Sequence, residues 1–372
     1  MQNNLQEKKK TLLLLRYLIC FNMKYIRFIL ILSFFICIFY SCSTDVDLYA
    51  EYKDVPIIYA MLDSHADTNY VKITRAFCGS NDNPINATDV ALISDSSNYQ
   101  GKLDVRFIEL KSTYGNKYEP TGRVLILDTL TIHDKEEGVF YSPDQVVYYT
   151  PEHLKAGTGN ERYSYRFVAV KSDGDTITAK TTMVGNEEFS IETSGVNFQL
   201  APTNAVGKLF FRTEGVASLY DVKIEFNYRE QKPGQELKMK KISRSFGTRP
   251  ISEYTHLIGN TYYLEYSPNW LFNTLGNAIG GDTVVDVNHP NVVRYIDDFI
   301  ISISAGGDEL YYYYLANQAQ MNSPISLVTT YTNIEGGYGL FSSRTTIQRE
   351  AKLTSSCKRD LFSVSAWGFK ED

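Results

Sequence analysis

The sequence has no apolar run long enough to cross a membrane, and it has few of the residues that build metal or catalytic centres. Its longest apolar run, Phe28 to Tyr40, contains 13 residues and is interrupted only by Ser33, whereas a spanning helix needs about 20. The 5 cysteines and 5 histidines include no C-x-x-C and no H-E-x-x-H spacing, and no G-x-S-x-G elbow is present. These absences exclude the common zinc and nucleophile motifs. We therefore expect no metal, no cofactor and no enzyme, and leave one alternative open: a hydrolase whose catalytic residues are scattered along the chain.

Basic residues are outnumbered, which argues against nucleic acid as a partner. The chain holds 37 basic and 43 acidic residues, and residues 1–41 contain six of the basic ones and one of the acidic ones. The chain from Cys42 onward therefore carries a net charge of about −11. Proteins that bind nucleic acid present basic patches, and anionic lipid attracts basic segments. We expect neither kind of electrostatic binding.

Residues 23–41 have the order of a secretory signal peptide. Lys24 and Arg27 form a short basic region, the apolar run follows, and the small residue Ser41 stands directly before Cys42. A buried core helix would be amphipathic, whereas this run is apolar all round. The pattern therefore predicts export from the cytoplasm and cleavage before Cys42.

The cysteine at the predicted cleavage site indicates lipid attachment. The stretch Phe39-Tyr40-Ser41-Cys42 resembles the lipobox of bacterial lipoproteins, in which the cysteine is acylated and becomes the new N-terminus. Residues 42–54, which are polar and acidic, would then be a short tether. Residues 1–22 have no place in such a signal, and we interpret them as an upstream segment that precedes the true start at Met23.

The cysteines allow one possible disulfide. Cys20 and Cys37 precede the predicted cleavage site, and Cys42 is predicted to be acylated, so Cys78 and Cys357 remain. The two could pair in an oxidising compartment. Their wide separation in the sequence supports neither pairing nor its absence.

Short stretches of alternating apolar and polar residues dominate the chain from Val55 onward. The clearest hairpin is predicted within residues 162–184, where Asp173-Gly174 supplies the turn because glycine accepts a positive φ. Residues 219–230 alternate as well, and residues 236–246 are expected to pair with them across a Lys-Pro-Gly turn. Such strands, joined by turns, are typical of antiparallel sheets.

This pattern predicts a mainly β protein with two antiparallel β-sandwich (immunoglobulin-like) domains and one or two short helices. We expect an N-terminal sandwich in residues 55–185 and a C-terminal β-rich domain in residues 186–372. A helix is predicted in residues 308–320, with Asp308 as its N-cap. Residues 361–369 are predicted to form the last strand.

Two stretches rich in Asp and Asn resemble calcium loops without their defining residues. The first contains, at alternate positions, Asp63, His65, Asp67 and Asn69. The second contains Asn81, Asp82, Asn83 and Asp89. A calcium loop also needs a glycine at its bend and a closing glutamate, and the first stretch has threonine at both places. Hairpin turns are the simpler interpretation, because Asp and Asn favour them.

Aromatic residues make up 13% of the chain, and 28 of them are tyrosines. The densest points supply a candidate surface for a ligand or a partner: Tyr262, Tyr263, Trp270, Tyr311 and Tyr314. Tyrosine serves interfaces well. It is also a common strand residue, so packing in a core or at a sheet edge is the alternative for each of the five.

The stretch YTNIEGGYGLFSSRTT, which begins at residue 331, resembles the closing segment of a family of Bacteroidetes lipoproteins known as domain of unknown function four-two-four-nine. The residues that match its N-I-x-x-G-x-G-x-F pattern are Asn333, Ile334, Gly337, Gly339 and Phe341. The signal, the early strand, the hairpin and the tyrosine-rich helix follow the same plan, so the resemblance covers most of the mature chain. For the glycines it implies a tight structural turn or a close backbone approach.

The resemblance implies an outer-membrane lipoprotein, often encoded near TonB-dependent transporters, and brings no catalytic residue with it. We therefore expect a non-catalytic binding or accessory role at the cell envelope, with membrane lipid and a transporter or another envelope protein as partners. Asp45 and Asp47, soon after Cys42, resemble acidic tethers that direct such lipoproteins to the cell face, which favours the surface side. A structural component of a surface complex and an envelope hydrolase are the alternatives.

Overall fold

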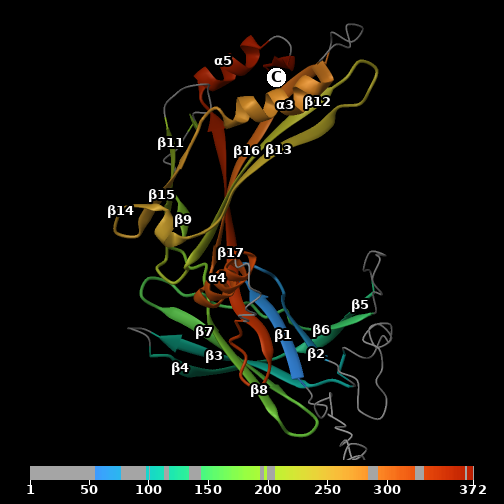
Figure 1. Ribbon diagram of the computed structural model, residues 1–372, viewed down its shortest axis with the longest axis vertical. Helices are drawn as coiled ribbons and strands as arrows, with labels where there is room; N and C mark the ends of the chain where they lie inside the picture. Colours follow the sequence, from blue (N-terminus) through green and yellow to red (C-terminus); the bar gives the residue numbers. More distant parts are fainter. Residues whose placement is uncertain are drawn as a thin grey trace, which may run out of the picture. The chain divides into compact units, whose positions relative to one another are not determined.

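The computed structural model describes residues 55–76, 98–99, 101–112, 117–133, 144–192, 197–198, 206–283, 292–322, 331–364 and 367–371 (Figure 1). These residues belong to one compact unit. The predicted signal peptide, the tether with Cys42, Cys78 and the second Asp- and Asn-rich stretch lie outside them. Of the helices that they form, none has the length and apolarity needed to cross a bilayer.

Three sheets contain the strands of the described residues, as the alternating patterns predict, and the mainly β, sandwich-like class is confirmed. The largest sheet has the order β13 (Lys238–Pro250), β12 (Leu219–Gln231), β16 (Val293–Gly306), β17 (Tyr338–Leu353), β1 (Val55–Leu62), β2 (Asn69–Ala76), β6 (Gln145–Thr150), β5 (Asp128–Ile132), with β10 (Asn197–Phe198) beside β17 and β18 (Phe369–Lys370) beside β16. The second sheet has the order β14 (Thr255–Ile258), β15 (Thr261–Tyr266), β11 (Gly207–Arg212), β9 (Ser190–Ile191). The third has the order β4 (Glu119–Ile126), β3 (Asp104–Ser112), β7 (Arg162–Val170), β8 (Thr176–Thr182).

One hydrophobic core, here called the first core, lies between the third sheet and the β17-β1-β2-β6 part of the large sheet. The predicted hairpin is confirmed as β7 and β8, which turn at Gly174 with φ 88°. Its inward side chains are buried as the period of two predicts: Tyr163, Tyr165, Phe167 and Ala169. They pack against Ile58, Ala60 and Leu62 of β1. Ile334 and Phe341, from far along the chain, complete this core.

The second core lies between the β13-β12-β16 part of the large sheet and the four strands of the second sheet. β12 and β13 pair as predicted, and the inward residues of β12 are buried: Val222, Ile224, Phe226 and Tyr228. Two helices, α3 (Trp270–Thr283) and α5 (Ser355–Ser363), add apolar side chains to this core. The immunoglobulin-like subclass and the domain limits at residues 185 and 186 stay predictions.

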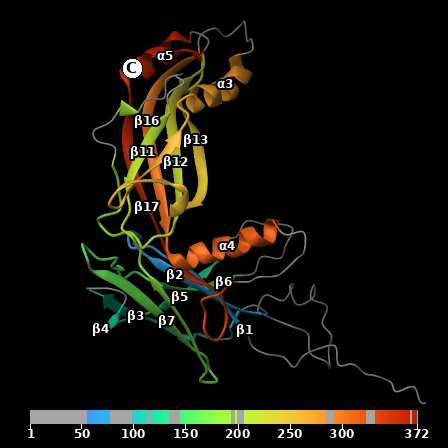
Figure 2. The same cartoon turned by 60° about the vertical axis from the view of Figure 1, so that its left-hand side comes forward.

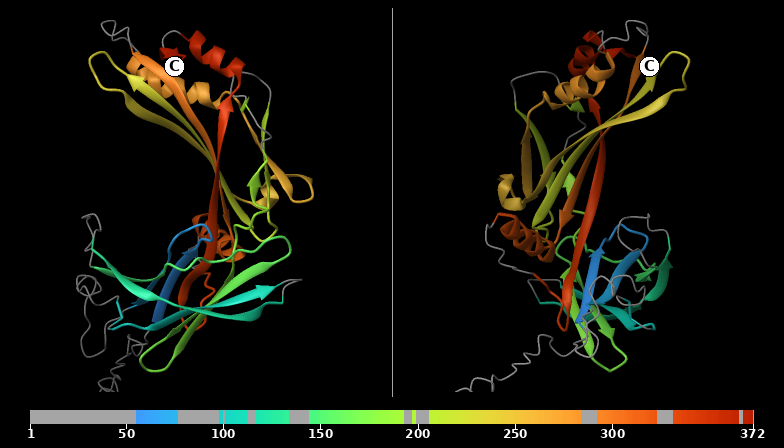
Figure 3. Two further views of the ribbon diagram at one scale, coloured as in Figure 1. Left: turned by 180° about the vertical axis from the view of Figure 1, so that it is seen from behind. Right: turned by 45° about the vertical axis from the view of Figure 1, so that its right-hand side comes forward.

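β17 belongs to both cores (Figures 2 and 3). Its residues Tyr338–Ser343 run parallel to β1, and its residues Arg344–Ala351 run antiparallel to β16. Phe341 is buried in the first core and Leu353 in the second. A single strand of 16 residues therefore connects the two packing layers through continuous backbone.

The prediction of a strand in residues 361–369 is wrong, because most of it is helical or outside regular structure. Thr354 caps α5 by accepting a hydrogen bond from the backbone N–H of Cys357 at 3.1 Å. Cys357 and Leu361 lie one turn apart and are both buried, which fixes the helix on the second core. Only Phe369–Lys370 form a strand there.

Within the described residues the protein has three α-helices and one 3-10 turn, η1 (Ile251–Glu253), more than the one or two short helices expected. Helix α3 was not predicted from the sequence. Its buried residues Leu271, Leu275 and Ile279 follow one another at intervals of four, which is a helical period. The glycines inside α3 weaken the helix signal, and burial of this apolar side stabilises it instead.

Candidate functional site

The predicted aromatic candidates lie on three different elements. Trp270 opens α3 and is 2% exposed in the second core, so it is a packing residue, and its assignment to a binding surface is wrong. Tyr262 and Tyr263 lie on β15, where Tyr262 packs on the second core and the ring of Tyr263 lies under the Lys208 ammonium at 4.4 Å. Tyr311 and Tyr314 belong to the tyrosine-rich helix α4 (Asp308–Asn322), which is confirmed. The prediction of Asp308 as N-cap is wrong, because Asp308 is the first helical residue and the carbonyl of Gly307 accepts the first helical hydrogen bond.

Helix α4 lies against the large sheet where β17 passes from one core to the other (Figure 2). Thr181 donates a hydrogen bond to the Glu309 carboxylate at 2.9 Å, and the N–H of Leu310 donates to Ser342 at 3.2 Å. Burial raises the pKa of Glu309, while the donors Thr181 and Ser342 oppose that rise. Farther along the helix, the Tyr314 hydroxyl donates to the carbonyl of Thr248 at 2.9 Å. The helix is thus held at both ends of its contact with the sheet.

Between α4 and the sheet lies a hollow of about 320 Å³, here called the α4 groove. Its helix side is formed by Leu310, Tyr313, Tyr314 and Asn317, which follow the i, i+3, i+4, i+7 pattern of one helix face. Tyr311, predicted to share a surface with Tyr314, is not among the lining residues because it lies about 100° around the helix from Leu310.

The floor of the α4 groove consists of two rows of residues that cross the strands. In the first row Gly306 pairs with Leu219 on one side and Arg344 on the other. A side chain on Gly306 would collide with Leu310, so this glycine lets the helix approach. The second row is polar and consists of Thr248, Asp221 and Ser304. Thr346 on β17 pairs with Ser304 and continues this row outside the groove. The floor therefore has Leu219 and Gly306 beneath the helix, Arg344 at the end of the same row, and a polar row beyond them.

Two opposite charges line the α4 groove. The Asp221 carboxylate accepts a hydrogen bond from Ser245 at 3.2 Å, which leaves acceptor capacity on its oxygens. The Arg344 guanidinium is exposed and has neither a hydrogen bond nor an ion pair with any other described residue. The lining as a whole has no net charge.

A second surface, here called the tyrosine face, lies on the side of the β17-β1-β2-β6-β5 part of the large sheet that points away from the first core. Figure 3, right, shows the backbone of β1 and its neighbours from this side. The members of the tyrosine face, apart from the half-buried Tyr149, are between 41 and 54% exposed: Tyr59, Met61, Tyr70, Leu130, Ile132, Tyr149 and Tyr338. Six of the 15 large exposed hydrophobic side chains of the described residues lie here. The solvent face of an antiparallel sheet is ordinarily polar, so this composition needs a cause.

Strand registers show that the tyrosine face is contiguous. Tyr59 pairs with Leu340 on β17 and with Lys72 on β2. Tyr70 pairs with Tyr149 on β6, and their rings lie 6.3 Å apart. Beyond β6, Leu130 on β5 pairs with Val147. On β1, β2 and β6 these side chains alternate with buried residues of the first core, so these three strands are apolar on both faces.

The glycine segment that carries the family resemblance joins β17 to β1. The Asn333 side chain donates to the carbonyl of Phe341 at 2.7 Å and accepts from its N–H at 3.0 Å, which closes a loop of nine residues. A Cβ on Gly337 would lie 2.7 Å from the carbonyl oxygen of Pro56. Gly339 has φ 118° and leaves no room for a Cβ beside the carbonyl of Ile58. The described geometry of Asn333, Gly337, Gly339 and Phe341 is therefore that of a close backbone approach.

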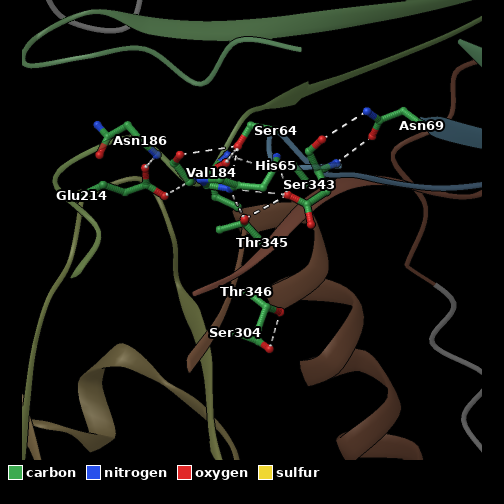
Figure 4. A network of polar contacts seen from close by, with 12 residues as sticks. Ser64, His65, Asn69, Val184, Asn186, Glu214, Ser304, Ser343, Thr345 and Thr346 are labelled. Carbon is green, nitrogen blue, oxygen red and sulfur yellow. Dashed lines mark hydrogen bonds and ion pairs between the residues drawn. The ribbon is translucent and has the colours of Figure 1, made fainter. Parts of the chain in front are cut away.

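A network of polar side chains holds the segment that leads from β8 to the second core (Figure 4). The buried Glu214 carboxylate accepts hydrogen bonds from the N–H groups of Gly185 and Asn186, both at 2.7 Å. On the other side of the segment, Ser343 accepts from the N–H of Val184 at 2.9 Å, and Ser64 donates to the Val184 carbonyl at 3.2 Å. We call this group the polar junction.

Asp63, His65 and Thr345 extend the polar junction, so that it contains the residue types of a hydrolase active site. Their geometry differs from that of a catalytic triad. His65 Nδ1 lies 2.7 Å from Thr345 Oγ1, and that hydroxyl donates its proton to Asp63 at 2.9 Å. A general base must instead receive the proton of the nucleophile. Thr345 is also fully buried, so no substrate could reach it. These contacts fix the loop after β1 on β17.

The first Asp- and Asn-rich stretch is a closed turn. The Asn69 side chain accepts from the N–H of Asp63 at 2.7 Å and donates to its carbonyl at 3.1 Å. Within the part of the chain that the structure describes, no group of three His, Cys, Asp or Glu side chains is placed to hold a metal ion. Cys357 is buried in α5.

Stability is expected to fall between pH 5 and pH 7.5 because of Glu214. Burial raises its pKa to about 7, against the opposing effect of the two N–H donors. The folded state therefore holds this proton more tightly than the unfolded chain, and it loses about 3 kcal/mol as pH rises from the unfolded pKa near 4.5 through 7. Chemical denaturation at a series of pH values measures this change.

The matched variant is Glu214→Gln, which has no proton to lose. Its unfolding free energy, compared with that of the wild type at each pH, isolates the titration of Glu214 from all other groups. The difference between the two proteins should change by about 3 kcal/mol across the interval. A constant difference would contradict the raised pKa.

Two of these features were missed in the sequence. The tyrosine face combines strands separated by more than 250 residues, and its only local signal is the apolar residue at every position of Val55–Leu62. The α4 groove could not be predicted, because it depends on where α4 packs on the sheet and not on the sequence of α4 alone.

Comparison with protein-family models and with curated proteins finds no match to this chain. The family resemblance therefore rests on the residues of the glycine segment and on the general plan of the chain.

Proposed function

We propose that this protein is a non-catalytic accessory lipoprotein of the outer membrane, held by an acylated Cys42, that docks through its tyrosine face onto an envelope protein. A TonB-dependent transporter is the partner that the family resemblance implies. The surface side of the membrane is favoured by the acidic tether. The tyrosine face is the single observation that carries the proposal.

The composition of the tyrosine face fits a protein interface. Soluble proteins rarely leave a large contiguous apolar surface exposed unless it binds something. Tyrosine and methionine are enriched in interface cores, and charged residues are depleted there. Lys72 is the charged residue closest to the centre of this face, and its ammonium donates to Gln145 at 2.8 Å near the margin. A surface of this composition suits a partner that is also largely uncharged.

The length of the tether supports a partner in the membrane. Twelve residues, 43–54, lie between Cys42 and Val55, the first residue of β1, so the two are thirteen Cα–Cα steps apart. Fully extended, they reach no farther than about 45 Å. Lipid at Cys42 would therefore keep Val55, the start of the strand that carries Tyr59 and Met61, within that distance of the bilayer and of the proteins embedded in it.

Replacing Tyr59 and Tyr70 by lysine is expected to abolish docking. Both rings are about half exposed, so lysine is tolerated in the free protein but would place two charges in a desolvated interface. We expect a pull-down of the tagged, lipidated full-length protein from detergent-solubilised outer membrane to recover a transporter in stoichiometric amount. The double variant should recover it at least tenfold less, which is about 1.4 kcal/mol or more of binding.

The matched control is Ile258→Lys, which changes another exposed apolar residue on β14. It should leave recovery unchanged. Intact-mass analysis of the same sample should show a chain that begins at acylated Cys42. A protein that is recovered alone, that keeps residues 1–41, or whose partner is lost equally in the control would contradict the proposal.

A structural component of a surface complex is the second candidate, because it would use the same exposed face. The two differ in stoichiometry and in the identity of the partner. Recovery of a transporter favours an accessory, whereas recovery of many copies of this chain or of a fibrous surface protein favours assembly. A hydrolase has less support, since the hydroxyl groups of the polar junction are bonded to backbone and to Asp63.

A further inference from the structure

We infer that the α4 groove binds a neutral carbohydrate. This binding site is separate from the tyrosine face and does not depend on docking. The inference rests on four properties of the groove: two aromatic side chains, a short apolar floor, a row of hydroxyl and amide groups, and a lining without net charge.

The tyrosines give the groove a surface suited to the apolar face of a sugar ring. Tyr313 and Tyr314 are both half-buried, and both line the hollow. Tyr314 is held across the groove by its hydrogen bond to Thr248, so it is a rigid wall. A side chain that is ordered before the ligand arrives loses little entropy on binding. Leu310 and Leu219 continue the apolar surface below the rings.

The polar row supplies partners for hydroxyl groups. Ser304 lines the groove and is hydrogen-bonded at 2.8 Å to Thr346, which lies outside it. The Ser304 oxygen has a further lone pair for a ligand hydroxyl. Asp221 can accept from two neighbouring ligand hydroxyls because Ser245 occupies only part of one oxygen. Asn317 donates to the carbonyl of Tyr313 at 3.0 Å, which leaves its amide oxygen to accept. Arg344 is a donor with no partner in the described chain.

Charge and size select among polar ligands. Arg344 and Asp221 balance each other, so the groove offers no excess of either charge to an ionic ligand. A volume of about 320 Å³ is at the lower end for small-molecule sites. It fits a short saccharide better than a lipid chain, which would need a larger apolar cavity.

The test is a microarray of neutral and acidic oligosaccharides, probed with the lipidated full-length protein in a detergent without a sugar headgroup. Binding to neutral oligosaccharides is expected. The strongest neutral oligosaccharide on the array is then titrated by calorimetry. Tyr313→Ala should weaken its affinity at least tenfold, and Asp221→Asn and Arg344→Ala should each weaken it at least fivefold.

The control is Tyr312→Ala, on the same helix, whose exposed ring contacts Tyr311 and Tyr331 and does not line the groove. It should bind as the wild type does. Thermal unfolding of every variant shows whether the fold is retained, and Tyr313→Phe, which keeps the ring, should retain most of the affinity if Tyr313→Ala unfolds. A wild type that binds no neutral oligosaccharide, a preference for acidic ones, or affinity unchanged in Tyr313→Ala would overturn the inference.

Discussion

Gly339→Ala is expected to lower the free energy of unfolding by about 3 kcal/mol or more. Alanine at φ 118° is strained, which costs about 1–3 kcal/mol. Its Cβ would also collide with the backbone of Ile58 on the neighbouring strand, and such overpacking costs a similar amount. β1 cannot move away freely, because Ile58 is also paired with Ile73 of β2 on its other side. Urea denaturation of the two proteins measures the difference.

A matched control separates the strain from the collision. Gly122 on β4 has φ 91°, and nothing lies within 4 Å of the position that its Cβ would take. Gly122→Ala therefore carries the backbone strain alone and should cost about 1–2 kcal/mol. If both substitutions cost the same, the close approach of β17 to β1 contributes nothing, and the glycine pattern has another cause.

Arg294→Met is expected to be the other strongly destabilising substitution, at about 3–5 kcal/mol. The Arg294 guanidinium is 1% exposed. Its Nε and Nη2 lie 2.8 and 2.6 Å from Oε2 of Glu230, and its Nη1 donates to the carbonyl of Trp367 at 2.7 Å. Methionine fills a similar space but leaves the buried Glu230 charge without its cation. It also removes the tie between β16 and the segment before β18.

The double variant Arg294→Met/Glu230→Leu tests this explanation. Removing both charges should recover most of the lost stability, because a buried ion pair replaced by apolar residues is often neutral. A double-mutant cycle in urea gives the coupling energy between the two residues. If the double variant is less stable than Arg294→Met alone, the loss comes from packing, and the buried charge is not its cause.

The elements that the sequence predicted well are those whose partners are close in the chain. The β7–β8 and β12–β13 hairpins each contain both strands and a turn within about 30 residues, so alternation and a glycine are sufficient evidence. Helix α4 follows from good helix formers. The segment that begins at Leu361 alternates weakly, and its helix is set by the cap at Thr354 and by packing, which outweigh local propensity.

The candidate sites were less predictable because they depend on distant pairings. The Asn-Ile-x-x-Gly-x-Gly-x-Phe segment could be assigned to a tight turn from its residue types, but its neighbour, β1, lies about 280 residues earlier. The sequence patterns around Tyr59 and Tyr70 predict their strands correctly. They do not indicate that the side of the sheet with these two tyrosines is left uncovered by other elements. The sequence of α4 does not indicate which of its faces packs on the sheet. The structure shows that it is the face with Leu310, which packs closely over Gly306.

The parallel pairing of β1 with β17 has a mechanical consequence for a protein tethered by its N-terminus. Tension on the tether pulls β1 from its first residue, while the second core holds β17 at its opposite end. In parallel strands such a load acts along the ladder, so the six pairs from Ile57–Tyr338 to Leu62–Ser343 share the force and shear together instead of opening one by one. If Cys42 is the anchor proposed above, this arrangement would transmit a pull on β1 into the second core without unravelling at β1.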